Sequence, residues 1–272
     1  VLNVTPDSFS DGGRFDSVDA ALLQAARLES AGCAVIDIGA ESTRPGSSPV
    51  SNEEQLRRII PVLRALRERT SVPISVDTTS AHVAGKCLDE GAHLVNDISA
   101  FRFDADMLPM LARTGAPAIA MHTLAEPRVM QDDPRYEDVV AEVGDHLRER
   151  LVACDKAGVD RHQVVLDPGI GFGKRLVDNL RILDGLSRIG GGTQAILVGP
   201  SRKRFLGEVT GRPVEDRGPA TAAACALAIQ AGAHMVRVHE PDEVRDAVLL
   251  AEALVQSRAG DVSGVDFRWP PS

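Results

Sequence analysis

The sequence predicts a single (β/α)8 TIM barrel. Three observations predict it: eight short apolar runs alternate with longer amphipathic segments, polar residues follow most of these runs, and no change of composition divides the 272 residues. One barrel of this kind ordinarily takes about 250 residues. An open, doubly wound parallel sheet is the main alternative, because it is built from the same alternating units.

The apolar runs have the composition expected of buried parallel strands. They are continuously apolar rather than alternating, as in sheets whose faces are covered by other elements. In chain order, the predicted strands are residues 1–4, 34–38, 73–77, 94–97, 118–122, 164–167, 195–198 and 235–239.

The segments between the runs have helical periodicity. Ser51 and Glu54 form the pattern of a capping box at the start of one predicted helix. Apolar stripes at helical spacing are Leu56, Ile59, Ile60, Leu63 and Leu66; Val18, Leu22, Ala25 and Leu28; and Val140, Val143, Leu147 and Leu151. Several predicted helices end beside a glycine suited to the left-handed conformation, at Gly32, Gly91, Gly115, Gly158 and Gly232.

We expect one domain over residues 1–256 and a flexible C-terminal tail over residues 257–272. The tail is rich in Gly, Pro and Ser and has no periodicity, which is typical of a frayed chain end.

Composition excludes several classes of function. The net charge of −9, with 30 basic against 39 acidic residues, is the opposite of what a general nucleic-acid binder carries. Aromatic residues make up only 3% of the chain, too few for base-stacking platforms. The longest apolar stretch, residues 220–229, is half the length of a membrane span, and no secretion signal is visible. We therefore expect neither a nucleic-acid nor a membrane partner.

The four cysteines are expected to be small buried hydrophobic residues in a reducing cytoplasm. They lie far apart in the sequence, without a CxxC pair and without a histidine at metal-ligand spacing. They are Cys33, Cys87, Cys154 and Cys225.

Polar residues gather where the apolar runs end. They are Asn3, Asp37, Asp77, Asn96, Asp97, His122, Asp167, Arg237 and His239, while Ser201, Arg202 and Lys203 follow the seventh run. In a barrel these positions converge on the C-terminal rim, where active sites of this fold are built. One carboxylate at a strand end is usually a helix cap, but seven of the eight runs end in this way. The sequence therefore predicts an active site at this rim.

The glycine-rich segment 169–174 has only a superficial likeness to nucleotide-binding loops. The spacing is one residue short of a Walker A motif, and Arg175 stands where Ser or Thr is required. The Rossmann spacing fails as well, so neither ATP, GTP nor NAD is predicted as a ligand.

Five motifs on five different loops together resemble the dihydropteroate synthases, the folate-pathway enzymes that sulfonamides target. They are residues 3–13 (NVTPDSFSDGG), 37–46 (DIGAESTRPG), 167–172 (DPGIGF), 199–203 (GPSRK) and 237–239 (RVH). The resemblance covers nearly the whole chain. It implies a barrel that joins the methylene of 6-hydroxymethyl-7,8-dihydropterin diphosphate to the amine of p-aminobenzoate and releases diphosphate. It further implies Mg²⁺ as the cofactor and a homodimer.

The resemblance also implies roles for individual residues on the pterin side. Asp167 would hold the 2-amino-4-oxo edge of the pterin, with Asn96 and Asp77 completing the hydrogen bonds. A buried carboxylate is a natural partner for that row of donors. Lys203 would bond the acceptor atoms of the ring, and Arg237 would lie flat against its face.

At the diphosphate end, the resemblance assigns Asn3 to Mg²⁺ and a set of cationic and polar groups to the anion. Mg²⁺ prefers an oxygen donor with water and substrate filling its other positions. The anion would be held by Thr43, Arg44, Arg237 and His239. The catalytic residues implied are Lys203, Arg237, His239 and Arg44. The p-aminobenzoate pocket would take Pro45, Phe172, Lys203 and Ser201, and Met121 would contact substrate.

No residue is an obvious nucleophile, which fits a reaction catalysed by electrostatic stabilisation and by positioning of the substrates. Residues 5–14 and 39–49 are rich in Gly, Pro and Ser, which predicts mobile loops that order over the substrates.

Two alternatives remain at this point. A pterin-binding methyltransferase domain, acting on methyltetrahydrofolate, shares the barrel and the Asp/Asn pterin contacts, but should lack the motif at 201–203 and the first loop motif. A non-catalytic pterin-binding paralogue would have lost Asn3, Arg44 or Lys203, and all three are present.

Overall fold

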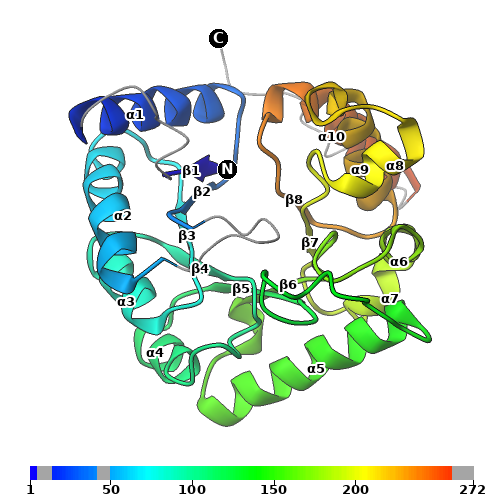
Figure 1. The fold of residues 1–272 in the computed structure, drawn as a ribbon, viewed down its shortest axis with the longest axis horizontal. Coiled ribbons are helices and arrows are strands. Elements are labelled where there is room, and N and C mark those ends of the chain that lie inside the picture. Colours follow the sequence, from blue (N-terminus) through cyan, green and yellow to red (C-terminus); the bar gives the residue numbers. More distant parts are fainter. Residues whose placement is uncertain (5–13, 42–49, 259–272) are drawn as a thin grey trace.

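The computed structural model describes residues 1–4, 14–41 and 50–258, with side chains from Val18 onward in the first helix. Parallel strands occupy the centre of the molecule, and helices surround them (Figure 1). The strands are β1 (Leu2–Asn3), β2 (Ile36–Gly39), β3 (Ile74–Asp77), β4 (Leu94–Asp97), β5 (Ala118–Met121), β6 (Val164–Asp167), β7 (Leu197–Val198) and β8 (Met235–Val236).

The strand order confirms a barrel rather than a doubly wound sheet. Strands β1 to β6 pair in strict sequence order, and every pair is parallel. A doubly wound sheet instead reverses its order at a switch point. A bridge between Leu166 and Ile196 leads from β6 towards β7, which pairs with β8.

Among the described residues, no strand pairing joins β8 to β1. The gap between β8 and β1 is crossed by a hydrogen bond of 2.9 Å from the nitrogen of Val1 to the carbonyl of Val238. It is also crossed by the side chain of Arg237, which reaches Asp37 of β2. Polar contacts therefore link the two edges of the barrel at this point.

Several strands are shorter than the sequence predicts. The eighth run ends as a strand at Val236, so Arg237 and His239 lie in the loop that follows. Asp37 is the second residue of β2 and not its end. The reason is that hydrophobicity marks burial, whereas the extent of a strand depends on how far its neighbours continue to pair.

The helices follow the strands in alternation. They are α1 (Arg14–Ser30), α2 (Asn52–Arg67), α3 (Ala81–Asp89), α4 (Met107–Thr114), α5 (Val139–Ala157), α6 (Leu176–Asp184), α7 (Leu186–Ile189), α8 (Arg204–Thr210), α9 (Gly218–Gln230) and α10 (Arg245–Arg258). Short 3-10 turns are η2 (Arg161–Gln163), η3 (Val214–Asp216) and η4 (Pro241–Glu243).

The local helix signals are confirmed. Ser51 caps α2 by accepting a hydrogen bond from the backbone nitrogen of Glu54, although the Glu54 side chain turns to Arg57 and Arg58 instead of completing the box. The predicted terminal glycines all have positive φ angles, as left-handed helix ends require. The α5 stripe at Val140, Val143, Leu147 and Leu151 is fully buried.

In the last described segment, α10 continues through Ser257 and Arg258, which the sequence predicts to lie in the tail. No glycine or proline interrupts the helix before Gly260, and the Ser257 hydroxyl bonds the Leu254 carbonyl. All four cysteines are free thiols, three of them buried. None of the helices in the described part of the chain is long and apolar enough to cross a membrane.

Candidate functional site

A pocket lies at the carboxyl ends of the strands, where the sequence predicts the active site. Its walls come from β3, β4, β5 and β6 and from the loops after β4, β6, β7 and β8. The lining residues are Asp77, Asn96, Ile98, Met121, Asp167, Gly169, Ile170, Phe172, Gly199, Lys203 and Arg237. Seven of the predicted site residues therefore line one pocket, although up to 160 positions separate them.

Asp77, Asn96 and Asp167 form the polar side of the pocket. Each is the last or next-to-last residue of its strand. Asp167 is 4% exposed, and its Oδ1 accepts a 2.7 Å hydrogen bond from the Gly169 nitrogen. Burial raises the pKa of Asp167 to about 6, against the opposing effects of that hydrogen bond and of the Lys203 charge.

Arg237 enters the same pocket from the loop after β8 and is held by two carboxylates. Its Nε donates to Oδ2 of Asp37 at 2.7 Å, and its Nη2 donates to Oδ2 of Asp77 at 2.8 Å. Burial opposes the charge of this guanidinium, but Asp37 and Asp77 raise its pKa overall. The arginine therefore stays charged at every physiological pH.

The two carboxylates that share Arg237 differ in their affinity for a proton. Burial raises the pKa of Asp77 to about 7. The positive charge of Arg237 lowers this pKa, but repulsion from the carboxylates of Asp37, Asp97 and Glu41 raises it further. Burial also works against the charge of Asp37, but the adjacent guanidinium holds the pKa of Asp37 below its ordinary value. Asp37 is thus the main counter-ion of the arginine.

Lys203 and Phe172 also line the pocket. The Lys203 Nζ lies 4.0 Å from the centre of the Phe172 ring, a cation–π contact. Burial lowers the pKa of Lys203 to about 8, and nearby Arg237 acts in the same direction. Phe172 also packs with Ile98, Met121 and Met130 in a small apolar cluster. The pocket therefore offers a hydrophobic surface beside its charged groups.

Ser201 and His239 lie together beside this pocket, a pairing that the sequence does not reveal. The Oγ of Ser201 is 3.0 Å from Nδ1 of His239, and it also accepts a hydrogen bond from the His239 backbone at 3.3 Å. Ser201 is buried and His239 is exposed. The pair ties the loop after β7 to the loop after β8.

Lys174 is a further buried basic residue, and the sequence predicts no role for it. It is 4% exposed, and its Nζ contacts Nδ1 of His122 and the Phe172 carbonyl, both at 2.9 Å. Burial lowers the pKa of Lys174 to about 7. A lone lysine within a glycine-rich, apolar segment is the only sequence signal that could have pointed to it.

Gly169 shows why the loop after β6 needs glycine. Its φ is +67°, and a Cβ atom there would lie 1.9 Å from the carbonyl oxygen of His122. No larger residue fits without moving the backbone. The loop is thereby pressed against the end of β5 and directs Phe172 into the pocket wall.

Some predicted residues lie elsewhere or outside the described chain. Asn3 is exposed at the end of β1. Thr43, Arg44 and Pro45 lie outside the described residues, as do the loop motif at 5–13 and most of the predicted mobile loop at 39–49. Within the described ranges, no group of three or more His, Cys, Asp or Glu side chains is arranged to hold a metal ion.

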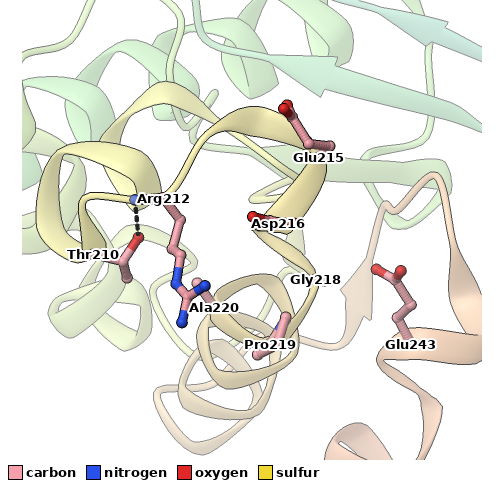
Figure 2. A pocket seen from close by; sticks show the side chains of 8 residues that line it. All are labelled: Thr210, Arg212, Glu215, Asp216, Gly218, Pro219, Ala220 and Glu243. Atoms are coloured by element: carbon pink, nitrogen blue, oxygen red, sulfur yellow. Dashed lines mark hydrogen bonds between the residues drawn. The ribbon is translucent and has the colours of Figure 1, made fainter.

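A second pocket lies on the outer side of the barrel (Figure 2). It lies between α8, η3, the start of α9 and Glu243 of η4, and it contains none of the predicted site residues. Its lining residues are Thr210, Arg212, Glu215, Asp216, Gly218, Pro219, Ala220 and Glu243.

The arrangement in the inner pocket suits a flat, nitrogen-rich heterocycle. Carboxylates and an amide at one side can accept from and donate to a polar ring edge. A guanidinium and an ammonium can bond acceptor atoms or lie against a ring face. Burial and the nearby positive charges lower the pKa of His239 to about 4, so its ring is neutral at physiological pH. A neutral imidazole N–H beside these cations can still donate a hydrogen bond to an anionic substituent.

Comparison with known proteins gives a consistent result. A family model described as "Pterin binding enzyme" matches residues 1–239. The chain is 40% identical to dihydropteroate synthase of Escherichia coli K12, over 95% of this chain and 91% of that protein. It is 42% identical to the mitochondrial folate synthesis bifunctional protein of Pisum sativum, but spans only about half of that relative, 54% of its length.

Solved structures agree with the sequence comparisons. Dihydropteroate synthase of Yersinia pestis, in complex with a sulfonamide drug, has a TM-score of 0.88 at 40% identity, covering 94% of this chain and 92% of that one. The Xanthomonas albilineans enzyme with 4-aminobenzoic acid has a TM-score of 0.87 at 42% identity, covering 93% and 91% of the two chains. The same enzyme has also been solved in complex with 7,8-dihydropteroate.

Proposed function

The chain belongs to the family of pterin-binding enzymes, and from this premise we propose that it acts as a dihydropteroate synthase. It joins the methylene carbon of 6-hydroxymethyl-7,8-dihydropterin diphosphate to the amine of p-aminobenzoate. A carbon–nitrogen bond forms, the carbon–oxygen bond to diphosphate breaks, and the amine loses a proton. The single observation that carries the proposal is that one pocket is lined by Asp77, Asn96, Asp167, Lys203 and Arg237.

The pterin ring binds in this pocket by its polar edge. Asp167 accepts hydrogen bonds from the 2-amino group and the ring N–H, and Asn96 and Asp77 complete the set. Lys203 donates to ring acceptors, while Arg237 lies against the ring face. These roles follow the family resemblance, and they are supported by the fact that all five side chains line the same pocket.

The chain's own groups act on the reaction by electrostatics. Departure of diphosphate leaves positive charge on the methylene carbon, which the electron-rich pterin delocalises. His239 and Arg237 stabilise the negative charge on the leaving group, together with Arg44 and Thr43 from the second loop. The amine of p-aminobenzoate approaches between Phe172, Lys203, Ser201 and Pro45, with Met121 in the pocket wall. No covalent intermediate with the protein is needed.

We propose Mg²⁺ as the cofactor and Asn3 as the residue that would bind it. When bound, the ion neutralises charge on the diphosphate. The exposed amide of Asn3 at the end of β1 is a hard oxygen donor open to solvent, which suits an ion that keeps several waters and binds substrate phosphates.

We also propose a homodimer in the cytoplasm. Helix α9 presents Leu227, 64% exposed, beside small residues such as Ala223, and α10 presents Leu250, 65% exposed. Exposed apolar residues on adjacent helices favour burial against a second copy. The free cysteines fit a reducing compartment. Sedimentation velocity tests the dimer, and a species of monomer mass at micromolar concentration would contradict it.

Product analysis tests the function. The purified chain is incubated with the dihydropterin diphosphate, p-aminobenzoate and Mg²⁺, and the products are separated by mass. We expect dihydropteroate, and we expect sulfonamides to compete with p-aminobenzoate. A parallel incubation with methyltetrahydrofolate tests the methyltransferase alternative. Tight binding of methyltetrahydrofolate without any dihydropteroate formation would favour that alternative over the synthase.

A further inference from the structure

Asp37 lies beneath the pterin pocket and is not part of its lining. In the register of the sheet, Gly39 of β2 is level with Asp77 of β3, and Asp77 is level with Asn96 of β4. Asp37 lies two residues before Gly39 and so is on the same face, one layer deeper in the barrel. Gly39 carries no side chain, so β2 contributes none at the level of the pocket.

One oxygen of Asp37 joins two residues that the pocket uses. Oδ2 accepts from Nε of Arg237 at 2.7 Å and from Nδ2 of Asn96 at 3.2 Å. The contact to Arg237 spans 200 positions of the sequence and connects the loop after β8 with β2. A residue 7% exposed therefore links the cation and the amide of the pterin site from below.

These hydrogen bonds fix the orientation of the Arg237 guanidinium and of the Asn96 amide, as well as their positions. A guanidinium that donates through both Nε and Nη2 to two carboxylates cannot rotate about its last bonds without losing a charge-assisted hydrogen bond. Likewise, an Asn96 side chain that donates its amide nitrogen to Asp37 must present its carbonyl oxygen elsewhere. Neither restraint is supplied by Asp77 alone.

We propose that Asp37 is a positioning residue for pterin recognition: it locks the guanidinium plane of Arg237 and the amide orientation of Asn96 before the substrate arrives. The inference rests on the proposed function, because it concerns residues assigned there to the pterin. Asp37 makes no substrate contact itself. Pre-organisation of this kind lowers the conformational cost of binding.

The test replaces Asp37 by Asn, which keeps the shape and removes the charge. Calorimetry with 6-hydroxymethylpterin, which lacks the diphosphate, isolates recognition of the ring. We expect a Kd increase of about tenfold or more for D37N. In steady-state assays, the KM for the pterin substrate should rise by a similar factor. The KM for p-aminobenzoate at saturating pterin should stay within about twofold, because no p-aminobenzoate contact is changed.

Asp178→Asn is the matched control. Asp178 is 1% exposed, accepts from Nε of Arg175 at 2.8 Å at the start of α6, and is not among the residues that line the pocket. D178N should lose stability without losing pterin affinity. If folded D37N binds the pterin as tightly as the wild type does, Asp37 has only a structural role and the inference is wrong. If the wild type fails to bind the pterin at all, the proposed function is wrong instead.

A second measurement keeps the inference testable should D37N not fold. In ¹⁵N-labelled wild-type protein without ligand, the Nε–H of Arg237, assigned with Arg237→Lys, should exchange slowly with solvent at pH 7. Its chemical shift should change little when 6-hydroxymethylpterin is added. Rapid exchange before binding and slow exchange afterwards would show that the ligand, and not Asp37, orders the guanidinium.

Discussion

Single charged side chains in the pocket decide what it can bind. Asp167 is deeply buried and lines the inner pocket, where we propose that it accepts from the donor edge of the pterin. An ionised carboxylate accepts two such hydrogen bonds, whereas its protonated form offers a donor where the ring already has donors. Because burial raises the pKa of Asp167 to about 6, its charge state changes within an accessible pH range.

The affinity for 6-hydroxymethylpterin is therefore expected to rise as the pH increases from 5 to 7. The folded-state pKa is raised, so protonated Asp167 predominates below about 6, and the proton must be lost before the ring binds well. Asp167→Asn should abolish this rise of affinity with pH and weaken binding of the pterin by about 2–4 kcal/mol. Calorimetry across this pH range gives both values. A wild-type affinity independent of pH would show that Asp167 does not hold the ring.

Replacement of Lys203 by Met is expected to reduce activity, whereas replacement of Lys174 by Met is expected mainly to reduce stability. Lys203→Met removes a cation from the pocket wall and should lower kcat/KM by about a hundredfold or more. Lys174→Met leaves His122 and the Phe172 carbonyl without their donor. It should lower the free energy of unfolding by about 1–3 kcal/mol with a smaller loss of turnover.

Urea titration and steady-state kinetics separate the two effects. Equal losses of kcat/KM in both variants, at equal stability, would contradict the distinction between a pocket lysine and a loop-holding lysine.

At the scale of elements, the loop that carries Ser201 and Lys203 is held from outside the barrel. Arg202 adopts a positive φ of 52°, unusual for a residue with a side chain. Its backbone nitrogen donates to Oγ1 of Thr221 on α9 at 3.0 Å, and its carbonyl accepts from Arg217 at 3.1 Å. Helix α9 and the residue before it thereby fix a turn whose next residue, Lys203, lines the inner pocket.

Thr221→Val should disturb this turn. The Arg202 nitrogen loses its acceptor, which is expected to destabilise the fold by about 1 kcal/mol, and kcat/KM should fall because Lys203 is less well held. Thr210→Val is the control, since that hydroxyl bonds only within and just beyond α8. Thermal unfolding and kinetics compare the two. An activity loss in Thr210→Val as large as in Thr221→Val would point to a general effect on stability.

Helix ends could be predicted from the sequence, whereas strand ends could not. A cap such as Ser51 or a terminal glycine such as Gly115 acts through neighbouring backbone atoms, so a few residues contain the whole signal. The length of β8 depends instead on pairing with β7, about 40 residues earlier. For the same reason, the predicted run 235–239 overestimates the strand while correctly marking where Arg237 emerges.

At the scale of the whole molecule, the barrel order brings distant polar residues to one rim. The strand-end pattern predicted that Asp77, Asn96, Asp167 and Arg237 would meet at the rim, because parallel strands share their carboxyl edge. It did not predict the partners: Asp37 with Arg237, Ser201 with His239, or Lys174 with His122. These contacts depend on side-chain orientation across the barrel, which no local pattern specifies. The assembled rim places Lys203 and Arg237 in one pocket with Asp77 and Asp167, in a chain whose net charge is −9.

We further expect p-aminobenzoate to bind appreciably only after the pterin diphosphate and Mg²⁺. Part of its pocket is assigned to the Gly-, Pro- and Ser-rich segment 39–49, and ordering a loop costs about 1–2 kcal/mol per residue. A ligand as small as p-aminobenzoate cannot offset much of that alone. Titrations with and without diphosphate and Mg²⁺ test the order. Equal affinity in both would indicate a preformed pocket.

The ratio of diphosphate released to dihydropteroate formed tests the central claim most directly. With the purified chain, the dihydropterin diphosphate, Mg²⁺ and p-aminobenzoate, both products should accumulate in a one-to-one ratio. Replacing Asp167 by Asn should lower kcat/KM for the pterin substrate by about thirtyfold or more. Without p-aminobenzoate, little diphosphate should appear. Release of diphosphate at the same rate in the absence of the amine, with no dihydropteroate formed in its presence, would contradict the assignment of this barrel as a dihydropteroate synthase.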